Sequence, residues 1–242
     1  MRRRTHTATA LLAALATLAC TASPSGAAEA NTDPLERARA FAAAGEDGPA
    51  VEVLAAAVEG GAVSAADLLA TGDLEPLRGA DAFRDLVCDH AAASRLHLVP
   101  EGEPGVPLRL TGRVVDAAGS PVAGAHVYAY QTDARGYYSR NDGEDSRNPR
   151  LFACGKSDRD GRVELVSVLP GSYPGSSIQR HVHYRVEADG HPELVGEVLF
   201  ADDENLGDRA RSIAARRGWP VVEAPRGADG VRRGEFELRL EG

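Results

Sequence analysis

The chain has few aromatic residues and lacks both a basic surface pattern and several common catalytic motifs. Its aromatics are six Tyr, five Phe and one Trp in 242 residues. No basic stripe offsets the net charge of −9, which argues against a nucleic-acid partner. No G-x-S-x-G elbow, P-loop or H-E-x-x-H helix is found. The classes that depend on those motifs are therefore disfavoured.

The chain also lacks a run long enough to span a membrane, although its N-terminus is apolar. A basic start, MRRRTHT, precedes an apolar segment at residues 8–19, which is too short to cross a bilayer. Small residues suited to cleavage follow at residues 26–30, so residues 1–30 have the pattern of a secretory signal peptide. We expect a secreted or extracytoplasmic protein. A lipoprotein anchored at Cys20 is the alternative, but Thr17 matches a lipidation site poorly.

Only two cysteines remain after the signal segment, Cys88 and Cys154. Export would place them in oxidising surroundings, where a disulfide can form and persist. A bridge would tie two different segments of the chain together. Two separate buried thiols are the alternative, and the sequence does not decide between them.

The first part of the chain after the signal has the spacing of short helices. Four segments have apolar residues at helical spacing or end at glycine, at residues 35–45, 49–61, 64–72 and 81–93. They are loosely similar to one or two tetratricopeptide-type units, fewer than such arrays need to be stable alone. We expect a small helical module at residues 31–100 that packs on the C-terminal part of the chain. It is a candidate surface for homo-oligomer formation or for a protein partner.

The pattern changes to alternation after the Pro- and Gly-rich residues 100–107. Six short alternating segments are predicted strands, at residues 108–116, 125–131, 161–168, 181–188, 193–200 and 235–240, with one short helix at residues 210–217. Gly, Pro and Asp turns separate them. The sequence therefore predicts a mainly β chain, with an antiparallel β-sandwich at residues 101–242 preceded by the helical module.

The stretch YPGSSIQRHVHY contains two candidate metal ligands, His181 and His183. On a β-strand, side chains two residues apart point to the same face, so the two imidazoles would project side by side. Such a pair can bind one metal ion, or it can lie on a solvated strand face. The pair alone does not decide between these interpretations.

Several motifs in the sandwich region occur in a recognisable order. They are TGRVVDAAGSPVAGAHVYAYQTDARGYYS, then SDRDGRVELVSVLPGSYP, then HVHYRVEADGHPELVGEVLFADD, and finally FELRL. In this order and spacing, residues 108–240 resemble the intradiol ring-cleavage dioxygenases, the family of catechol and protocatechuate dioxygenases. The matched features are a strand pair followed by G-x-Y, a P-G-x-Y-P turn, an H-x-H strand and a closing strand.

The resemblance implies a mononuclear non-haem Fe(III) centre held by two tyrosinates and two histidines. Matched residue by residue, the ligands are Tyr138, Tyr173, His181 and His183, with Tyr137 as the alternative if the register differs by one. Phenolates are hard anionic donors that a trivalent cation can hold deprotonated. This set differs from the two-histidine, one-carboxylate set of Fe(II) oxygenases.

The resemblance also implies a reaction. A small catecholic substrate and O2 would give a cis,cis-muconate-type diacid, with no external reductant. Tyr173 would be the catalytic residue, because it would leave the metal and accept a substrate proton.

The charged residues near the histidines depart from the family pattern. The family often has an arginine three residues before the first histidine, and here that position is Ile178. Arg180 would point away from the histidine face, whereas Arg185 shares that face but lies beyond His183. Glu197 stands where a glutamine is common, and it would disfavour acidic catechols if it faces the pocket.

Two alternatives do not involve ring cleavage. The opening GRVVDAAGSPVAGAHV is also similar to transthyretin-like and carboxypeptidase-regulatory sandwiches, which would make the domain a binding module. That interpretation explains the first two strands but not the four ordered ligands. A degenerate relative that binds metal without cleaving catechol is the other alternative.

Overall fold

In the computed structural model, the described residues are 33–139 and 146–242, so the predicted signal segment and Cys20 lie outside them. The helices are α1 Pro34–Ala43, α2 Asp47–Glu59, α3 Ala65–Ala70, α4 Asp81–Asp89 and α5 Asp208–Arg217, with a 3-10 helix η2 at Gly72–Gly79. The strands are β1 Arg95–His97, β2 Pro107–Val115, β3 His126–Gln131, β4 Leu151–Lys156, β5 Arg162–Val168, β6 His181–Glu187, β7 Leu194–Phe200, β8 Val221–Val222 and β9 Arg232–Arg239.

Local capping explains where two of the first helices begin. The Asp33 carboxylate accepts a hydrogen bond from the Leu35 N–H, and a proline occupies the first helical position. Ser64 and Asp67 form a reciprocal capping box at the start of α3. These contacts satisfy backbone donors that the first turn of a helix leaves unpaired.

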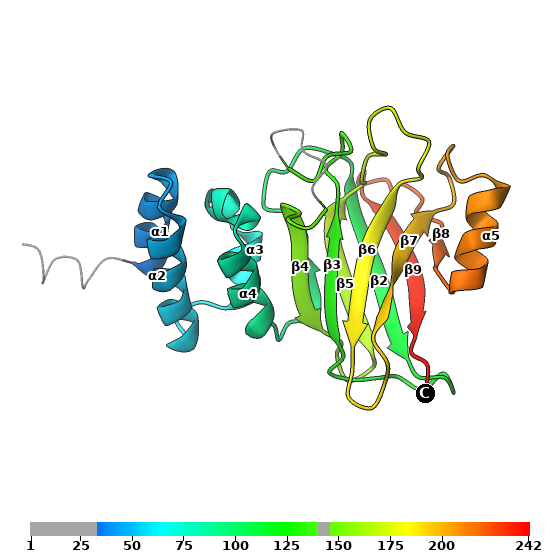
Figure 1. Ribbon diagram of the computed structural model, residues 1–242, viewed down its shortest axis with the longest axis horizontal. Helices are drawn as coiled ribbons and strands as arrows, with labels where there is room; N and C mark the ends of the chain where they lie inside the picture. Colours follow the sequence, from blue (N-terminus) through cyan, green and yellow to red (C-terminus); the bar gives the residue numbers. More distant parts are fainter. Residues whose placement is uncertain (1–32, 140–145) are drawn as a thin grey trace, which may run out of the picture. The chain divides into compact units, whose positions relative to one another are not determined.

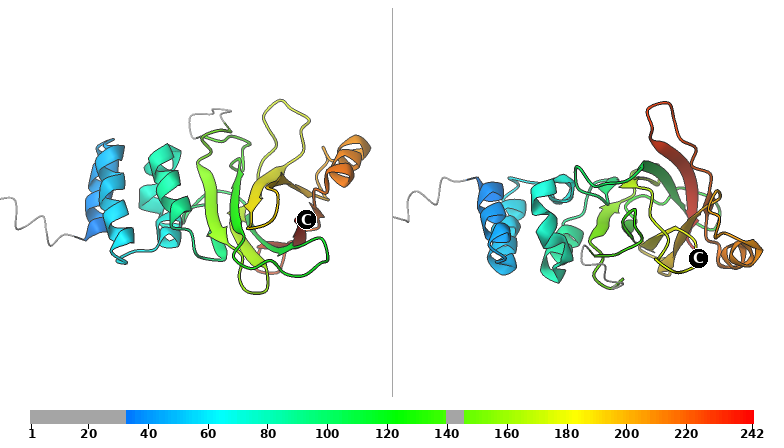
Figure 2. Two further views of the ribbon diagram at one scale, coloured as in Figure 1. Left: turned by 60° about the horizontal axis from the view of Figure 1, so that its bottom comes forward. Right: turned by 90° about the horizontal axis from the view of Figure 1, so that it is seen from above.

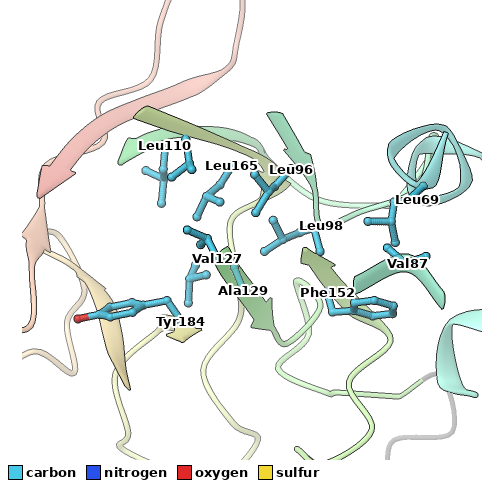
Figure 3. Close-up of a cluster of buried hydrophobic side chains, with 14 of the residues drawn as sticks. Leu69, Val87, Leu96, Leu98, Leu110, Val127, Ala129, Phe152, Leu165 and Tyr184 are labelled. Atoms are coloured by element: carbon cyan, nitrogen blue, oxygen red, sulfur yellow. The ribbon is translucent and has the colours of Figure 1, made fainter. Parts of the chain in front are cut away.

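The strands form two sheets, ordered β1-β5-β2-β9 and β4-β3-β6-β7-β8 (Figure 1). Alternate residues of each strand point between the sheets. Figure 3 shows Leu110 and Leu165 of one sheet gathered near Val127 and Tyr184 of the other. All four side chains are buried. The other face of the five-stranded sheet is therefore left for different contacts, and the candidate site lies on it.

The prediction of a mainly β fold with a small helical part is confirmed, and all six predicted strands are present. Among the described residues, β1, β4 and β8 were not predicted. Strand β4 is buried on both faces over its first three residues, so it shows no clear alternation. Three neighbouring pairs, β1–β5, β2–β9 and β7–β8, are parallel, so the sandwich is mixed rather than purely antiparallel.

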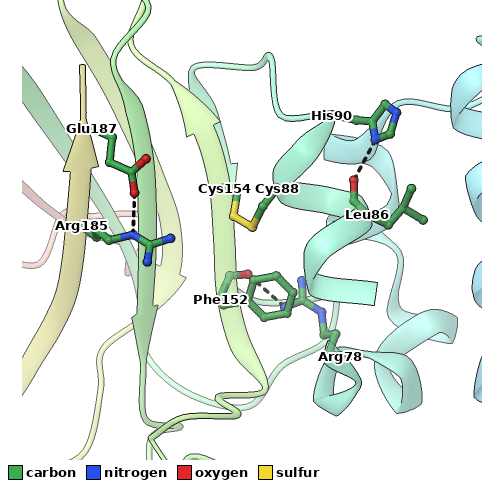
Figure 4. Close-up of a disulfide and its surroundings, with 8 residues drawn as sticks. All are labelled: Arg78, Leu86, Cys88, His90, Phe152, Cys154, Arg185 and Glu187. Carbon is green, nitrogen blue, oxygen red and sulfur yellow. Dashed lines mark hydrogen bonds and ion pairs between the residues drawn. A yellow bond between two sulfur atoms is a disulfide. The ribbon is translucent and has the colours of Figure 1, made fainter. Parts of the chain in front are cut away.

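Helix α4 lies beside β4, and a disulfide joins them (Figures 1 and 4). Cys88 on α4 and Cys154 on β4 form this bridge, with their Cα atoms 5.1 Å apart. The structure thus decides the question that the sequence leaves open.

A buried arginine reinforces the same junction. The guanidinium of Arg78 donates hydrogen bonds to the carbonyls of Leu98, Arg150 and Phe152, at 3.0, 3.1 and 3.3 Å. Figure 4 shows the bond to Phe152. Arg78 has no exposed surface. Buried residues of α1–α4 and of both sheets belong to one hydrophobic cluster. A division of the chain near residue 100 stays a prediction.

Helix α5 lies at the other edge of the five-stranded sheet, beside β7 and β8 (Figure 2). Ala214 of α5 and Leu199 of β7 are buried in a second, smaller cluster. Within the described ranges, no helix combines the length and the apolar character needed to cross a membrane.

Replacing both Cys88 and Cys154 by serine is expected to lower the free energy of unfolding by about 2–4 kcal/mol. The bridge joins residues 66 positions apart, so its loss frees a long loop in the unfolded chain. Urea unfolding with and without reductant measures the effect. The reduced wild type should match the double variant, and a double variant as stable as the oxidised wild type would contradict the prediction.

Candidate metal centre

The loop after β3 carries Tyr138 and is fixed by an aspartate. The Asp133 carboxylate accepts hydrogen bonds from the N–H groups of Arg135 and Tyr137, at 2.9 and 3.0 Å. Beyond the turn, the Arg150 N–H donates to the Tyr138 carbonyl at 2.9 Å. The backbone is therefore held on both sides of Tyr138, whose side chain is buried with 2% of its surface exposed.

The loop after β5 carries Tyr173 and is pressed against the first loop. The Gly171 N–H donates to the Asp133 carbonyl at 2.8 Å. Gly136 has a φ of +94°, and a Cβ placed there would lie 2.0 Å from the Ser172 carbonyl oxygen. Only glycine tolerates both conditions, so Gly136 permits the approach that brings Tyr138 and Tyr173 together.

The two histidines come from β6 and point to the face of the sheet away from the core, as their spacing predicts. The His181 Nδ1 lies 2.8 Å from the Gln179 carbonyl oxygen. A carbonyl can only accept a hydrogen bond, so Nδ1 must carry the proton. In the neutral imidazole, the Nε2 of His181 is then the nitrogen with the lone pair, which is the form that binds a metal.

The four predicted ligands meet in a closed ring of contacts. The Tyr138 hydroxyl lies 2.6 Å from the Tyr173 hydroxyl and 3.0 Å from the His183 Nε2. The Tyr173 hydroxyl lies 3.0 Å from the His181 Nε2, and the two Nε2 atoms are 3.0 Å apart. Each donor atom therefore contacts two of the other three.

This spacing fits one cation. Ligand atoms about 2.0–2.1 Å from a cation and at right angles to each other are about 2.9 Å apart. The donor set also fits chemically, since two phenol oxygens and two imidazole nitrogens are present. The four side chains are thus suited to hold a metal ion together, and their role as ligands stays a prediction.

The structure separates Tyr138 from its neighbour. The ring of Tyr137 lies under the guanidinium of Arg135, 5.2 Å from the guanidinium carbon, and Tyr138 is the residue that joins the histidines. The register chosen from the sequence is therefore the one in which the tyrosine reaches the cluster.

Burial shapes the protonation of the cluster. Burial, and then the hydrogen bond with Tyr173, raises the pKa of Tyr138 far above its usual range. Burial, and then the charge of His181, lowers the pKa of His183 to about 3. Without a cation, the phenol is protonated and the His183 imidazole is neutral. A bound cation would have to displace the phenol proton.

Two further side chains border His183, and the sequence predicts only one of them. Tyr130 of β3 pairs with His183 in the sheet, and the two rings stack with centroids 4.4 Å apart. Glu197 of β7 pairs with His183 from the other side, with an oxygen 4.0 Å from Nδ1. Burial raises the pKa of Glu197, and also that of Tyr130. Tyr130 could have been identified from the sequence only by predicting how β3 and β6 pair, because that register places it beside His183.

Glu197, His181 and His183 offer a second donor set, with ligand atoms within 4.8 Å of one another. The closest measured approach of Glu197 to His183 is at Nδ1, whereas the tyrosines meet the Nε2 atoms. The carboxylate is thus placed as a partner of His183 on the far side of the ring, rather than among the four converging donors.

The two arginines predicted near the site are paired with carboxylates. The backbone N–H of Arg180 donates to the Asp203 carboxylate, and its guanidinium lies 3.5 Å from Asp203 and 3.7 Å from Asp202. The guanidinium of Arg185 lies 3.2 Å from the carboxylate of Glu187, as Figure 4 shows. Each arginine therefore has an acidic partner outside the four converging donors. Ile178, at the position where the family pattern has an arginine, is 46% exposed.

Comparison with known protein families identifies the region that contains the two sheets and the four converging donors. A family model described as Dioxygenase matches residues 85–242, well over half of the chain. The matched region contains all the strands of both sheets and all four converging donors. The chain belongs to the intradiol ring-cleavage dioxygenase family.

Individual relatives agree with this assignment. The chain is 32% identical over 146 residues to the hydroxyquinol 1,2-dioxygenase of Rhodococcus opacus, a match that covers 52% of this chain and 47% of that protein. It is 28% identical over 180 residues to catechol 1,2-dioxygenase 1 of Acinetobacter lwoffii, covering 62% and 56%. The crystal structure of catechol 1,2-dioxygenase from Pseudomonas arvilla C-1 superposes with a TM-score of 0.52 and 27% identity, over 63% of this chain and 57% of that one. The chain spans about half the length of the curated relatives it matches.

Acid is expected to destabilise the metal-free protein partly through His183. The unfolded state takes up a proton at this residue near its ordinary pKa of 6.5, whereas the folded state does so only near 3. The unfolded state binds more protons between these values, so stability falls as the pH is lowered through this window, by up to about 1.4 kcal/mol per pH unit.

Urea unfolding of the metal-free wild type and of His183→Gln between about pH 3.5 and 6.5 measures this contribution. The variant should have a shallower dependence on pH, because it lacks the titrating ring. His126→Gln, an exposed position on the neighbouring strand, is the control. Equal slopes for His183→Gln and the wild type would contradict the assignment.

Proposed function

We propose that this protein is a non-haem Fe(III) intradiol dioxygenase that cleaves a catechol-type ring with O2 to a cis,cis-muconate-type diacid. The observation that carries the proposal is the closed ring of contacts among Tyr138, Tyr173, His181 and His183. These residues would hold the iron. When bound, Fe(III) supplies the Lewis acidity that draws electron density from a catechol, so that O2 can add to the ring without an external reductant.

The two tyrosines have different surroundings, which supports different roles. Tyr138 is buried and its loop is hydrogen-bonded on both sides. Tyr173 is partly exposed, and its loop continues into the exposed residues Pro174 and Gly175. We assign Tyr138 as the fixed ligand. Tyr173 would be the catalytic residue. With its phenol proton displaced by the cation, its phenolate oxygen could turn from the cluster and accept a proton from a substrate hydroxyl.

The histidines have positioning contacts of their own. His181 is oriented through Nδ1 by the Gln179 carbonyl, and it is buried with 7% of its surface exposed. His183 lies against Tyr130. Side chains held in this way need little reorganisation to bind a cation, and preorganisation of this kind favours a specific site over a solvated histidine face.

The non-enzymatic alternatives are less well supported. A transthyretin-like binding module does not require two tyrosines and two histidines from three separate segments to converge. A degenerate relative that binds metal without cleaving catechol retains the same donors, so only a reaction assay separates it from the proposed enzyme.

We also propose that the protein is exported. The signal-like residues 1–30 and the disulfide between Cys88 and Cys154 support this, because disulfides persist in oxidising compartments. A lipid anchor at Cys20 is the alternative form of export.

The purified protein, loaded with iron where necessary, is expected to bind one iron per chain and to absorb visible light through tyrosinate-to-iron charge transfer. Addition of catechol without oxygen should shift the band to longer wavelength, and oxygen should then yield the ring-opened diacid. Iron content, the visible spectrum and product analysis are the measurements. A colourless protein with no bound iron would contradict the proposal, and a coloured protein without product would favour the degenerate relative.

Single substitutions in the same assay test the ligands. Tyr138→Phe and His183→Ala should each lose most of the bound iron, because each removes a donor atom from the ring of contacts. Tyr137→Phe is the matched control, since its ring contacts Arg135 instead. Stoichiometric iron in His183→Ala would contradict the ligand set.

A neutral catechol is expected to be a better substrate than protocatechuate, which carries a carboxylate. Arg180 and Arg185 are already paired with carboxylates, and an ionised Glu197 would add a negative charge beside His183. Two unit charges about 10 Å apart repel by roughly 1.7 kcal/mol at an effective dielectric constant of about 20, which is more than tenfold in kcat/KM.

Glu197→Gln should therefore reduce the preference for catechol, as measured by the ratio of kcat/KM values for the two substrates. Glu187→Gln is the matched control, because Glu187 lies on β6 and its carboxylate pairs with Arg185. An unchanged ratio in Glu197→Gln would show that this carboxylate does not set the preference.

A further inference from the structure

His183 lies in a row of side chains that crosses the five-stranded sheet. Phe152 on β4 pairs with Tyr130 on β3, Tyr130 pairs with His183 on β6, and His183 pairs with Glu197 on β7. Directly paired residues on adjacent antiparallel strands point to the same face of the sheet. His183 is therefore bordered by Tyr130 on one side and by Glu197 on the other.

The two histidines are oriented by different means. His181 has a hydrogen bond of 2.8 Å from Nδ1 to a carbonyl. For His183, the nearest measured partner of Nδ1 is a Glu197 oxygen at 4.0 Å, which is beyond hydrogen-bonding distance. Its ring instead lies face to face with Tyr130, at 4.4 Å between centroids and 17° between planes. The Nε2 of His183 lies 3.0 Å from the Tyr138 hydroxyl and from the His181 Nε2, within the cluster itself. Outside the four converging donors, stacking on Tyr130 is thus the contact that sets the plane of this ring.

The position of Tyr130 is itself fixed by the sheet and by a neighbouring ring. It lies on β3, which has a hydrogen-bonded neighbour on each side, so its backbone is fixed. Its ring lies 6.1 Å from the Tyr138 ring. A stacking partner on a central strand can hold an imidazole more firmly than a side chain on a loop.

We propose that Tyr130 is a positioning residue of the metal centre, whose ring fixes the plane of His183 so that Nε2 points at the cation. The inference rests on the proposed function, because it assumes that His183 is a metal ligand. It predicts that the aromatic ring of Tyr130 matters and that its hydroxyl does not.

The test compares variants that keep or lose the ring. Tyr130→Phe and Tyr130→Trp keep an aromatic face, whereas Tyr130→Leu removes it. Tyr128→Leu is the matched control, because Tyr128 lies on the same face of β3 two residues away and its ring lies against Arg185 instead. If Tyr130→Leu does not fold, Tyr130→Val serves in its place, since β-branched residues favour strands.

The measurement is the rate at which the Fe(III)-loaded proteins release iron to a chelator, together with the electron paramagnetic resonance spectrum of the bound iron. Loss of a residue that orients a metal-bound histidine typically weakens metal binding by about 10–100-fold. We expect Tyr130→Leu to release iron at least about tenfold faster, with a changed spectrum. The Phe and Trp variants and Tyr128→Leu should stay within about twofold of the wild type.

Three outcomes would overturn the inference. One is release from Tyr130→Leu at the wild-type rate with an unchanged spectrum, and another is equally fast release from Tyr128→Leu. Fast release from Tyr130→Phe would assign the role to the hydroxyl instead of the ring.

The same experiments distinguish failure of this inference from failure of the proposed function. A wild type that binds iron but cleaves no catechol would overturn the proposed reaction, and the release rates would still decide the role of Tyr130. A wild type that binds no iron would overturn both.

Discussion

The pairing of β3 with β6 is the constraint on which the candidate metal centre depends. It sets Tyr130 against His183, and it makes both histidines face away from the core while Tyr184 points into it. A slip of one residue would exchange these faces, because strand side chains alternate. The buried alternation of Val182, Tyr184 and Val186 opposes such a slip. The apolar core thus fixes the direction of the polar residues on the opposite face.

The second constraint is the contact between two loops that are distant in sequence. Sheet pairing delivers the histidines, but the tyrosines come from loops, which need their own restraint. Asp133 provides it by accepting backbone hydrogen bonds within its own loop and offering its carbonyl to Gly171 in the other. Gly136 lets the backbones touch. The donors therefore come from a rigid strand and two loops that are hydrogen-bonded to each other. This arrangement suits the proposed site, which would hold a cation and release one ligand.

Site residues that belong to a local sequence motif could be predicted from the sequence. Site residues that depend on how distant strands pair could not. His181 and His183 share a face by simple alternation, and Tyr173 stands in a recognisable turn. Tyr130 belongs to the site only through the β3–β6 register, which no single segment reveals. Strand β4 was not predicted because burial on both faces removes the alternating pattern of apolar and polar residues. Cys154, the disulfide partner of Cys88, lies on that strand, so the bridge could not be predicted either. The pairing of Arg180 with Asp203 likewise depends on a contact across 23 positions.

The charges around the centre follow from two departures that act in the same direction. Where the family pattern has an arginine, this chain has Ile178, and where it has a glutamine, this chain has Glu197. The first removes a positive charge, and the second adds a negative one when the Glu197 carboxylate is ionised. A cation bound by two phenolates and two neutral imidazoles would then have a more negative environment than the family pattern provides. Such surroundings stabilise the higher oxidation state of a metal and repel anionic substrates. In the proposed enzyme, the same two positions would thus influence both the charge state of the metal and the preference among catechols.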